Sequence, residues 1–106
     1  MGRKNEMTFI QFLSKIKKQH EADLKVLKIK NHDYAGNSDA LANLRDFGSF
    51  GVIVRLSDKF SRLKRFVRSG GVLAVKNETI FETLLDIRNY AHIAEVMLKE
   101  EKMEKD

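Results

Sequence analysis

The stretch that decides the fold is NETIFETLLDIRNYAHIAEVML, residues 77–98. It contains no Gly or Pro and opens with Asn77, a residue type that favours helix N-caps, so it predicts one long helix. Apolar residues fall on two sides of this helix, which is typical of a helix that other elements bury. We therefore expect residues 77–98 to be the centre of a helical bundle.

Three carboxylates and one amide share a face of this helix, because they recur at i, i+4 and then i+3 spacing. They are Glu78, Glu82, Asp86 and Asn89. Carboxylates this close repel one another and are costly to bury, and a hard divalent cation, Mg²⁺ or Mn²⁺, would relieve the conflict. A solvated acidic strip explains the same spacing. Two interpretations stay open: a metal site of Glu78, Glu82 and Asp86 that faces a cleft, or a solvent-facing surface.

Composition limits the class of protein. A chain of 106 residues with 42% hydrophobic and 33% charged residues is typical of one globular domain. The absence of cysteine excludes disulfides, thiolate nucleophiles and zinc-thiolate sites. No apolar run is long enough to cross a membrane or to direct secretion, so we expect a cytoplasmic protein without a membrane partner. The net charge of +5 favours an anionic partner.

The rest of the chain also predicts helices, since it has no proline and only six glycines. TFIQ at residues 8–11 has the form of a capping box, and Ser69-Gly70-Gly71 is a helix stop. We expect an all-α fold, a small bundle of about four helices in a single domain over residues 8–98. The expected helices are residues 8–30, 38–47, 50–68 and 77–98, with frayed ends at 1–7 and 99–106 and a short apolar connection at 72–75.

A polar cluster, KNHDYAG at residues 30–36, interrupts the apolar pattern. Lys30 offers a positive charge, Asp33 a carboxylate, and Tyr34 a ring with a hydroxyl, all of which suit a phosphate or metal site. The same residues are also compatible with a plain helix C-terminus that precedes a turn. Composition does not choose between the two interpretations.

A basic ridge follows on the helix expected over residues 50–68. Arg55, Asp58, Lys59 and Arg62 recur at i, i+3, i+4 and i+7, so one acid is flanked by bases on a single ridge. The cations suit phosphate oxygens, with Asp58 orienting one of them or reaching a metal. A salt-bridged, solvated face is the alternative.

Four segments in this order resemble a known family: KNHDYAG (30–36), ALANLRDFG (40–48), RLSDKFSRL (55–63) and NETIFETLLDIRNYA (77–91). The chain is similar over roughly residues 30–97 to the small phage and bacterial domain called nucleotide modification associated domain 1. That domain is related to the MazG-like all-α nucleoside triphosphate pyrophosphatases. The resemblance implies a helical bundle completed by homo-oligomerisation as a dimer or tetramer, a location in the host cytoplasm if a phage encodes it, Mg²⁺ held by carboxylates, and hydrolysis to a nucleoside monophosphate and pyrophosphate.

In MazG-like enzymes the metal site pairs an ExxE-type helix with an ExxD-type helix. Glu78, Glu82 and Asp86 match the second of these helices with i+4 in place of i+3 spacing. The earlier helices contain no ExxE, and Asp58, helped by Asp33, is the acid available on that side.

Cleavage of an α-β phosphoanhydride requires a cation on the phosphates, a positioned water, and positive side chains for the leaving pyrophosphate. Our hypothesis is a metal-dependent pyrophosphohydrolase of canonical or modified dNTPs. In it Glu78, Glu82 and Asp86 hold the metal, Glu82 or Asp58 orients the water, Lys30, Arg55, Lys59 and Arg62 bind phosphate oxygens, and Asp33, Tyr34 and Asn89 complete the nucleotide site.

Two alternatives fit the same residues. The missing ExxE and the large basic surface favour a non-catalytic member of this fold, such as a phage accessory protein that binds a nucleotide or blocks a host protein. The basic ridge could also bind nucleic acid, although no helix-turn-helix signature accompanies it.

Overall fold

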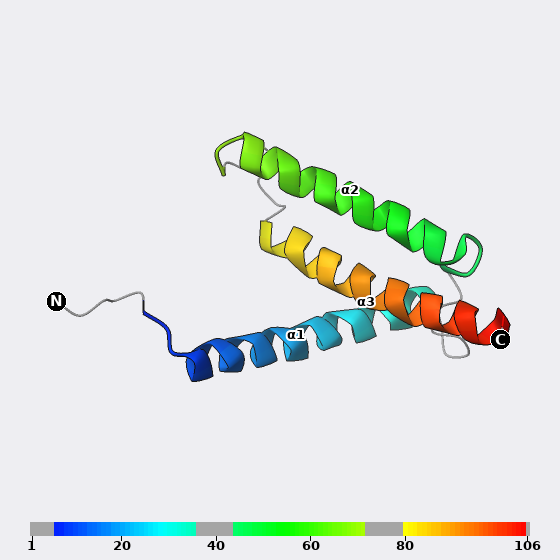
Figure 1. Ribbon diagram of the computed structural model, residues 1–106, viewed down its shortest axis with the longest axis horizontal. Coiled ribbons are helices and arrows are strands. Elements are labelled where there is room, and N and C mark those ends of the chain that lie inside the picture. The colour runs from blue at the N-terminus through cyan, green and yellow to red at the C-terminus, as the bar shows by residue number, and fades with distance from the viewer. Residues whose placement is uncertain (1–5, 36–43, 72–79, 106) are drawn as a thin grey trace.

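The computed structural model describes the backbone of residues 6–35, 44–71 and 80–105, and side chains in these ranges except 31–35 and 103–105. The described residues form three helices and no strand: α1 (Phe9–Ala35), α2 (Gly48–Arg68) and α3 (Ile80–Lys105) (Figure 1). The predicted all-α class is therefore confirmed. The fourth helix, expected over 38–47, falls largely outside the described residues, and its last residues form a turn that leads into α2.

The bundle is organised around α3, as Figure 1 shows, because α3 lies between α1 and α2. Helices α2 and α3 run antiparallel along most of their lengths. In the described part of the chain, the buried apolar side chains are few. They are Val52 of α2 and Ala94 and Met97 of α3, with Leu44, Tyr90 and Ile93 packed around them.

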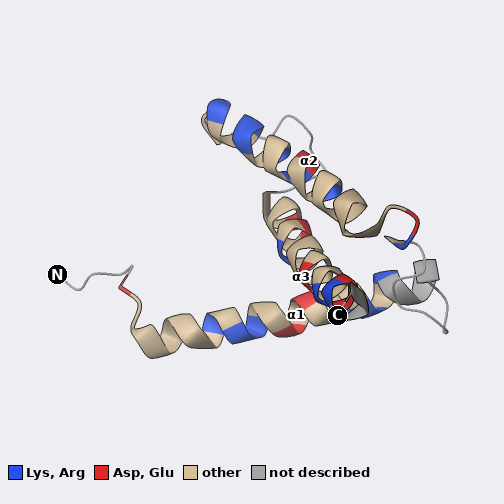
Figure 2. Cartoon of the chain, turned by 45° about the vertical axis from the view of Figure 1, so that its right-hand side comes forward, with Lys and Arg blue, Asp and Glu red and all other residues tan. Residues whose placement is uncertain are grey.

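Helix α1 is attached differently. It lies across the picture in Figure 2, whereas α3 points toward the viewer, so the two helices cross and contact each other over a short length. The N-terminal half of α1 extends away from the other two helices (Figure 1). This arrangement leaves one of the three helices largely uncovered.

The N-terminus of α1 is as predicted, and its C-terminal part is longer than predicted. The predicted capping box is present: Thr8 N–H donates to Gln11 Oε1 at 3.0 Å, and Gln11 N–H donates to Thr8 Oγ1 at 3.1 Å. The helix does not end near Lys30 as expected but continues to Ala35, so residues 31–35 are helical. The reason is that no Gly or Pro occurs between Thr8 and Gly36, and polar side chains alone do not end a helix.

The C-terminus of α2 is a Schellman motif at the predicted glycines. Gly70 N–H donates to the Val67 carbonyl at 3.1 Å, and Gly71 N–H donates to the Phe66 carbonyl at 2.9 Å. Gly70 has φ +72°, a left-handed conformation that residues with a Cβ adopt at a cost. The end of α2 is therefore determined by the local sequence.

The N-terminus of α2 is capped from another helix. Phe47 occupies the N-cap position and supplies no side-chain hydrogen bond. Instead Glu101 of α3 accepts from Ser49 N–H at 3.1 Å and from Ser49 Oγ at 2.8 Å. A carboxylate at this point also interacts favourably with the positive end of the helix dipole.

The same contact corrects the expected C-terminal tail. We predicted fraying from Lys99 onward, but α3 continues to Lys105. Glu101 is held by Ser49, and Glu100 pairs with Arg45 in the turn before α2. Glu100 and Glu101 thus have partners far away in sequence, which charge composition alone cannot show.

Candidate functional site

One carboxylate lies between cations from two other helices. Asp86 of α3 forms an ion pair with Lys59 of α2, with Oδ2 2.9 Å from Nζ, and accepts a hydrogen bond through Oδ1 from Lys30 Nζ of α1 at 3.4 Å. The side chains of Asp86 and Lys59 are 21% and 18% exposed, and that of Lys30 is 49% exposed. Two ammonium groups and one carboxylate leave a net positive charge in a partly desolvated position. This cluster of Lys30, Lys59 and Asp86 is the Asp86 site.

The surroundings of the Asp86 site come from neighbouring turns of α3. Asn89 is 8% exposed and Thr83 is 5% exposed, so the helix face beside Asp86 is buried and polar. Glu82, four residues before Asp86 and on the same side of the helix, is exposed. The acidic face predicted for this helix therefore runs from solvent at Glu82 into the bundle at Asp86 and Asn89.

Helix α2 brings one member of its basic ridge into the site. Lys59 reaches Asp86, and Arg62, which shares that side of the helix, is partly buried. Arg55 and Asp58 are exposed. Of the predicted phosphate-binding residues, the structure thus brings Lys30 and Lys59 together, with Arg62 on the same side of α2 as Lys59.

Three predicted site residues cannot be placed. Glu78 lies outside the described residues, and the side chains of Asp33 and Tyr34, at the end of α1, are outside the described part as well. Of the predicted metal ligands, Glu82 and Asp86 remain. No group of three His, Cys, Asp or Glu side chains in the described ranges is arranged to hold a metal.

The two described carboxylates suit only one mode of metal binding. Mg²⁺ is commonly held by one or two carboxylates and takes its other ligands from water and nucleotide phosphates. Glu82 and Asp86 at i, i+4 meet that requirement, whereas an all-protein cage would need more ligands. The donor set is therefore compatible with a metal that binds together with a nucleotide.

A second ion pair, which the sequence analysis did not single out, fixes α1 to α3. Arg88 donates to Asp23 from Nε at 2.6 Å and from a terminal nitrogen at 2.9 Å, and Asp23 is 4% exposed. These hydrogen bonds lower the pKa of Asp23 below its usual value and raise the pKa of Arg88. The rings of His20 and His92 meet edge to face beside this pair, with centroids 6.5 Å apart.

A signal for this pair was present in the sequence. Asp23 lies in the apolar stripe of α1, between His20 and Leu27, where a buried acid needs a cationic partner. The Asp23–Arg88 pair and the Lys30–Asp86 pair both join α1 to α3.

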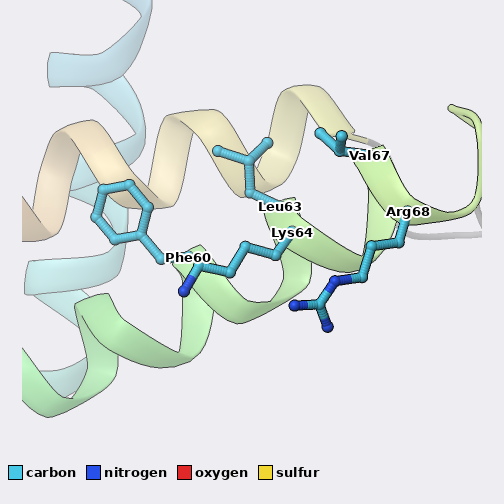
Figure 3. Close-up of a pocket in the computed structure, with 5 residues that line it drawn as sticks. All are labelled: Phe60, Leu63, Lys64, Val67 and Arg68. Carbon is cyan, nitrogen blue, oxygen red and sulfur yellow. The ribbon is translucent and has the colours of Figure 1, made fainter.

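An open groove lies along the C-terminal half of α2. Figure 3 shows its apolar wall of Phe60, Leu63 and Val67, with Lys64 and Arg68 at the rim. Phe60 is 45% exposed and Val67 68% exposed, so the groove is a surface feature of the helix. We do not assign it to the Asp86 site, since no residue is common to both.

In comparisons with known proteins, no family model matches the chain, and no curated protein or solved structure matches it significantly. None of the helices in residues 6–35, 44–71 and 80–105 is both long enough and apolar enough to span a membrane.

Proposed function

We propose that the protein binds a nucleoside triphosphate, canonical or modified, at the Asp86 site and hydrolyses it to the monophosphate and pyrophosphate with Mg²⁺ or Mn²⁺. One observation carries the proposal: two ammonium groups from different helices converge on one carboxylate of α3. This is the arrangement that a phosphate chain and a divalent cation would share. The segments that resemble nucleotide modification associated domain 1 contain the same three residues, and the resemblance implies a metal-binding role for Asp86.

The ion pairs of the Asp86 site give the lysines a position before a ligand binds. The side chain of Lys59 is 18% exposed, so its ammonium group has few conformations open to it and is already directed toward Asp86. Phosphate oxygens would take over Lys59 and Lys30, with Arg62 beside them. Asp86 would then be free to act with Glu82, and with Glu78, toward the metal, which neutralises the phosphates when bound. Asp58 and Glu82 are the candidates that orient the attacking water.

A non-catalytic nucleotide- or protein-binding role is the second candidate, and a specific observation favours it. Asp86 is already neutralised by two lysines, and the described residues contain no three-ligand metal cluster. In this role Lys30 and Lys59 bind an anionic ligand without turnover. In either role we propose a homo-oligomer, a dimer or tetramer.

The test measures pyrophosphate release from canonical and modified dNTPs with Mg²⁺ or Mn²⁺, together with thermal stabilisation by each nucleotide. Asp86→Asn is expected to abolish turnover while it preserves or strengthens nucleotide binding, because it removes a negative charge from a phosphate site. Lys59→Gln is expected to weaken binding. Asp46→Asn and Lys18→Gln change exposed residues away from the site and serve as matched controls.

Three results separate the candidates. Turnover that Asp86→Asn abolishes supports the hydrolase. Nucleotide-dependent stabilisation that Lys59→Gln weakens, without product, supports the non-catalytic binder. If no nucleotide stabilises the protein and no product forms, both candidates are wrong, and a steep salt dependence of DNA or RNA binding would then favour the basic face of α2.

A further inference from the structure

Two of the three histidines of the chain meet where α1 crosses α3. His20 of α1 and His92 of α3 lie edge to face, with ring centroids 6.5 Å apart and ring planes at 60° to each other. Both residues are exposed, so an ion from solvent can reach the two rings. The nucleotide site proposed at Asp86 uses neither ring.

The helix turns that carry these two rings are already held together. Asp23 lies one turn after His20 on α1, and Arg88 lies one turn before His92 on α3. The hydrogen bonds from Arg88 to Asp23, at 2.6 and 2.9 Å, therefore join the same two turns. A ligand that binds both rings does not have to bring the helices together, so less conformational entropy is lost when it binds.

Two neighbouring imidazoles are a ligand set for divalent transition ions. Imidazole nitrogen suits Zn²⁺, Ni²⁺ and Cu²⁺, whereas Mg²⁺ and Ca²⁺ prefer oxygen ligands. At a metal–nitrogen distance of about 2.0–2.1 Å, two rings bound to one tetrahedral ion have their centres roughly 5–6 Å apart. The 6.5 Å between His20 and His92 exceeds this by about 1 Å, a difference that rotation of two exposed side chains removes.

The number of protein ligands indicates what kind of site this is. The described residues bring no third His, Cys, Asp or Glu into a metal-binding cluster with the two rings. Water would supply the remaining ligands, in contrast to a structural zinc site, which four protein side chains close. A two-histidine site of this kind binds its ion reversibly and responds to the concentration of metal.

We propose that His20 and His92 together bind one divalent transition ion, Zn²⁺, Ni²⁺ or Cu²⁺, and that this ion joins α1 to α3. The ion adds a link between the two helices beside the Asp23–Arg88 and Lys30–Asp86 pairs, so the crossing is held more firmly when metal is bound. This site does not depend on the proposed nucleotide site, because it uses other residues and another class of ion.

Thermal unfolding of the full chain with and without metal tests the proposal. We expect about 1 mM Zn²⁺ or Ni²⁺ to raise the Tm by at least about 2 °C, and an excess of EDTA to reverse the rise. His20→Ala and His92→Ala each remove one of the two ligands and are expected to abolish it. The matched control is His32→Ala, which removes the third histidine, about three turns further along α1, and should keep the rise. The Tm of each variant without metal verifies that it folds.

Calorimetric titration with Zn²⁺ or Ni²⁺ measures the site directly. We expect one ion per chain with a Kd below about 1 mM, and a Kd at least about tenfold higher in His20→Ala and in His92→Ala. Sedimentation should give the same mass with and without metal, because both ligands belong to one chain. A weaker Kd, a Tm rise that survives either variant, or a mass that doubles when metal is added would overturn the inference; the last result would mean that the ion bridges two copies.

Discussion

The α2–α3 pair and α1 are attached to the bundle in different ways. Between α2 and α3 the contact has an apolar core, with Val52, Ala94 and Met97 buried together along an antiparallel pair. Polar contacts, Lys59 with Asp86 and Ser49 with Glu101, flank this core. Between α1 and α3 the contact is mainly ionic, through Asp23–Arg88 and Lys30–Asp86. Apolar burial is tolerant of orientation, whereas an ion pair with two hydrogen bonds sets a specific angle. We therefore expect the antiparallel pair of α2 and α3, the α2–α3 hairpin, to contribute most of the stability. We expect α1 to position Lys30 at the Asp86 site.

The largest effect is expected in the hairpin core. Met97→Ala removes a side chain that is 3% exposed and leaves a cavity between α2 and α3. We expect the free energy of unfolding to fall by about 2–4 kcal/mol in urea titrations. Leu98→Ala, at the neighbouring residue that is 48% exposed, is the control and should cost much less. Equal losses in the two variants would mean that the hairpin core is not where stability resides.

A smaller and more local loss of stability is expected when the Asp23–Arg88 ion pair between α1 and α3 is broken. Arg88→Ala leaves the carboxylate of Asp23 buried without its partner, and we expect a loss of about 1–3 kcal/mol, since Arg88 is itself about one-third exposed. Amide exchange should accelerate in α1 more than in α2, because only α1 depends on this pair. Lys99→Ala, which removes the exposed pair with Glu95, should leave both measurements unchanged. Amide exchange that accelerates equally in all three helices would contradict the division into a stable α2–α3 hairpin and an α1 held by the Asp23–Arg88 ion pair.

The smallest change in stability is expected when the pH is lowered. The hydrogen bonds from Arg88 lower the pKa of Asp23 in the folded chain, so its ionised form contributes stability above the unfolded pKa of about 3.9. That contribution is lost as pH falls through the lower, folded pKa, so stability should decline below about pH 4. The groups that face Asp23 are Arg88, His20 and His92. Thermal unfolding of Asp23→Asn over the same range should decline less steeply, and an unchanged slope would remove Asp23 as the titrating group.

Several parts of the fold were open to prediction because they depend on near neighbours in sequence. The capping box at Thr8 and Gln11 and the glycine stop at Gly70 use hydrogen bonds within a few residues. The ends that were predicted wrongly depend on distant partners or on weak signals. The C-terminus of α3 persists because Glu101 meets Ser49, and α1 continues past Lys30 because polar residues are only mild helix breakers.

The candidate site likewise has features that helical spacing predicted and features that depend on how the helices pack. Helical spacing grouped Glu82, Asp86 and Asn89 on one side of a helix, and this grouping needs no knowledge of the other helices. It could not show that Asp86 meets Lys59 and Lys30 while Glu82 stays exposed, since that difference depends on where α1 and α2 pack. An acid in the apolar stripe of α1 indicates that Asp23 needs a cationic partner, but its spacing could not identify Arg88, which is 65 positions away in sequence.

By itself the sequence determined the all-α class, the glycine stop of α2 and the set of charged residues on each helix side, because these follow from spacing and backbone preference. Only the tertiary structure decided which charges meet. Ion pairs between helices join residues 56 and 65 positions apart, such as Lys30 with Asp86 and Asp23 with Arg88. Their distance depends on the crossing of α1 over α3, and no local property of the chain specifies that crossing.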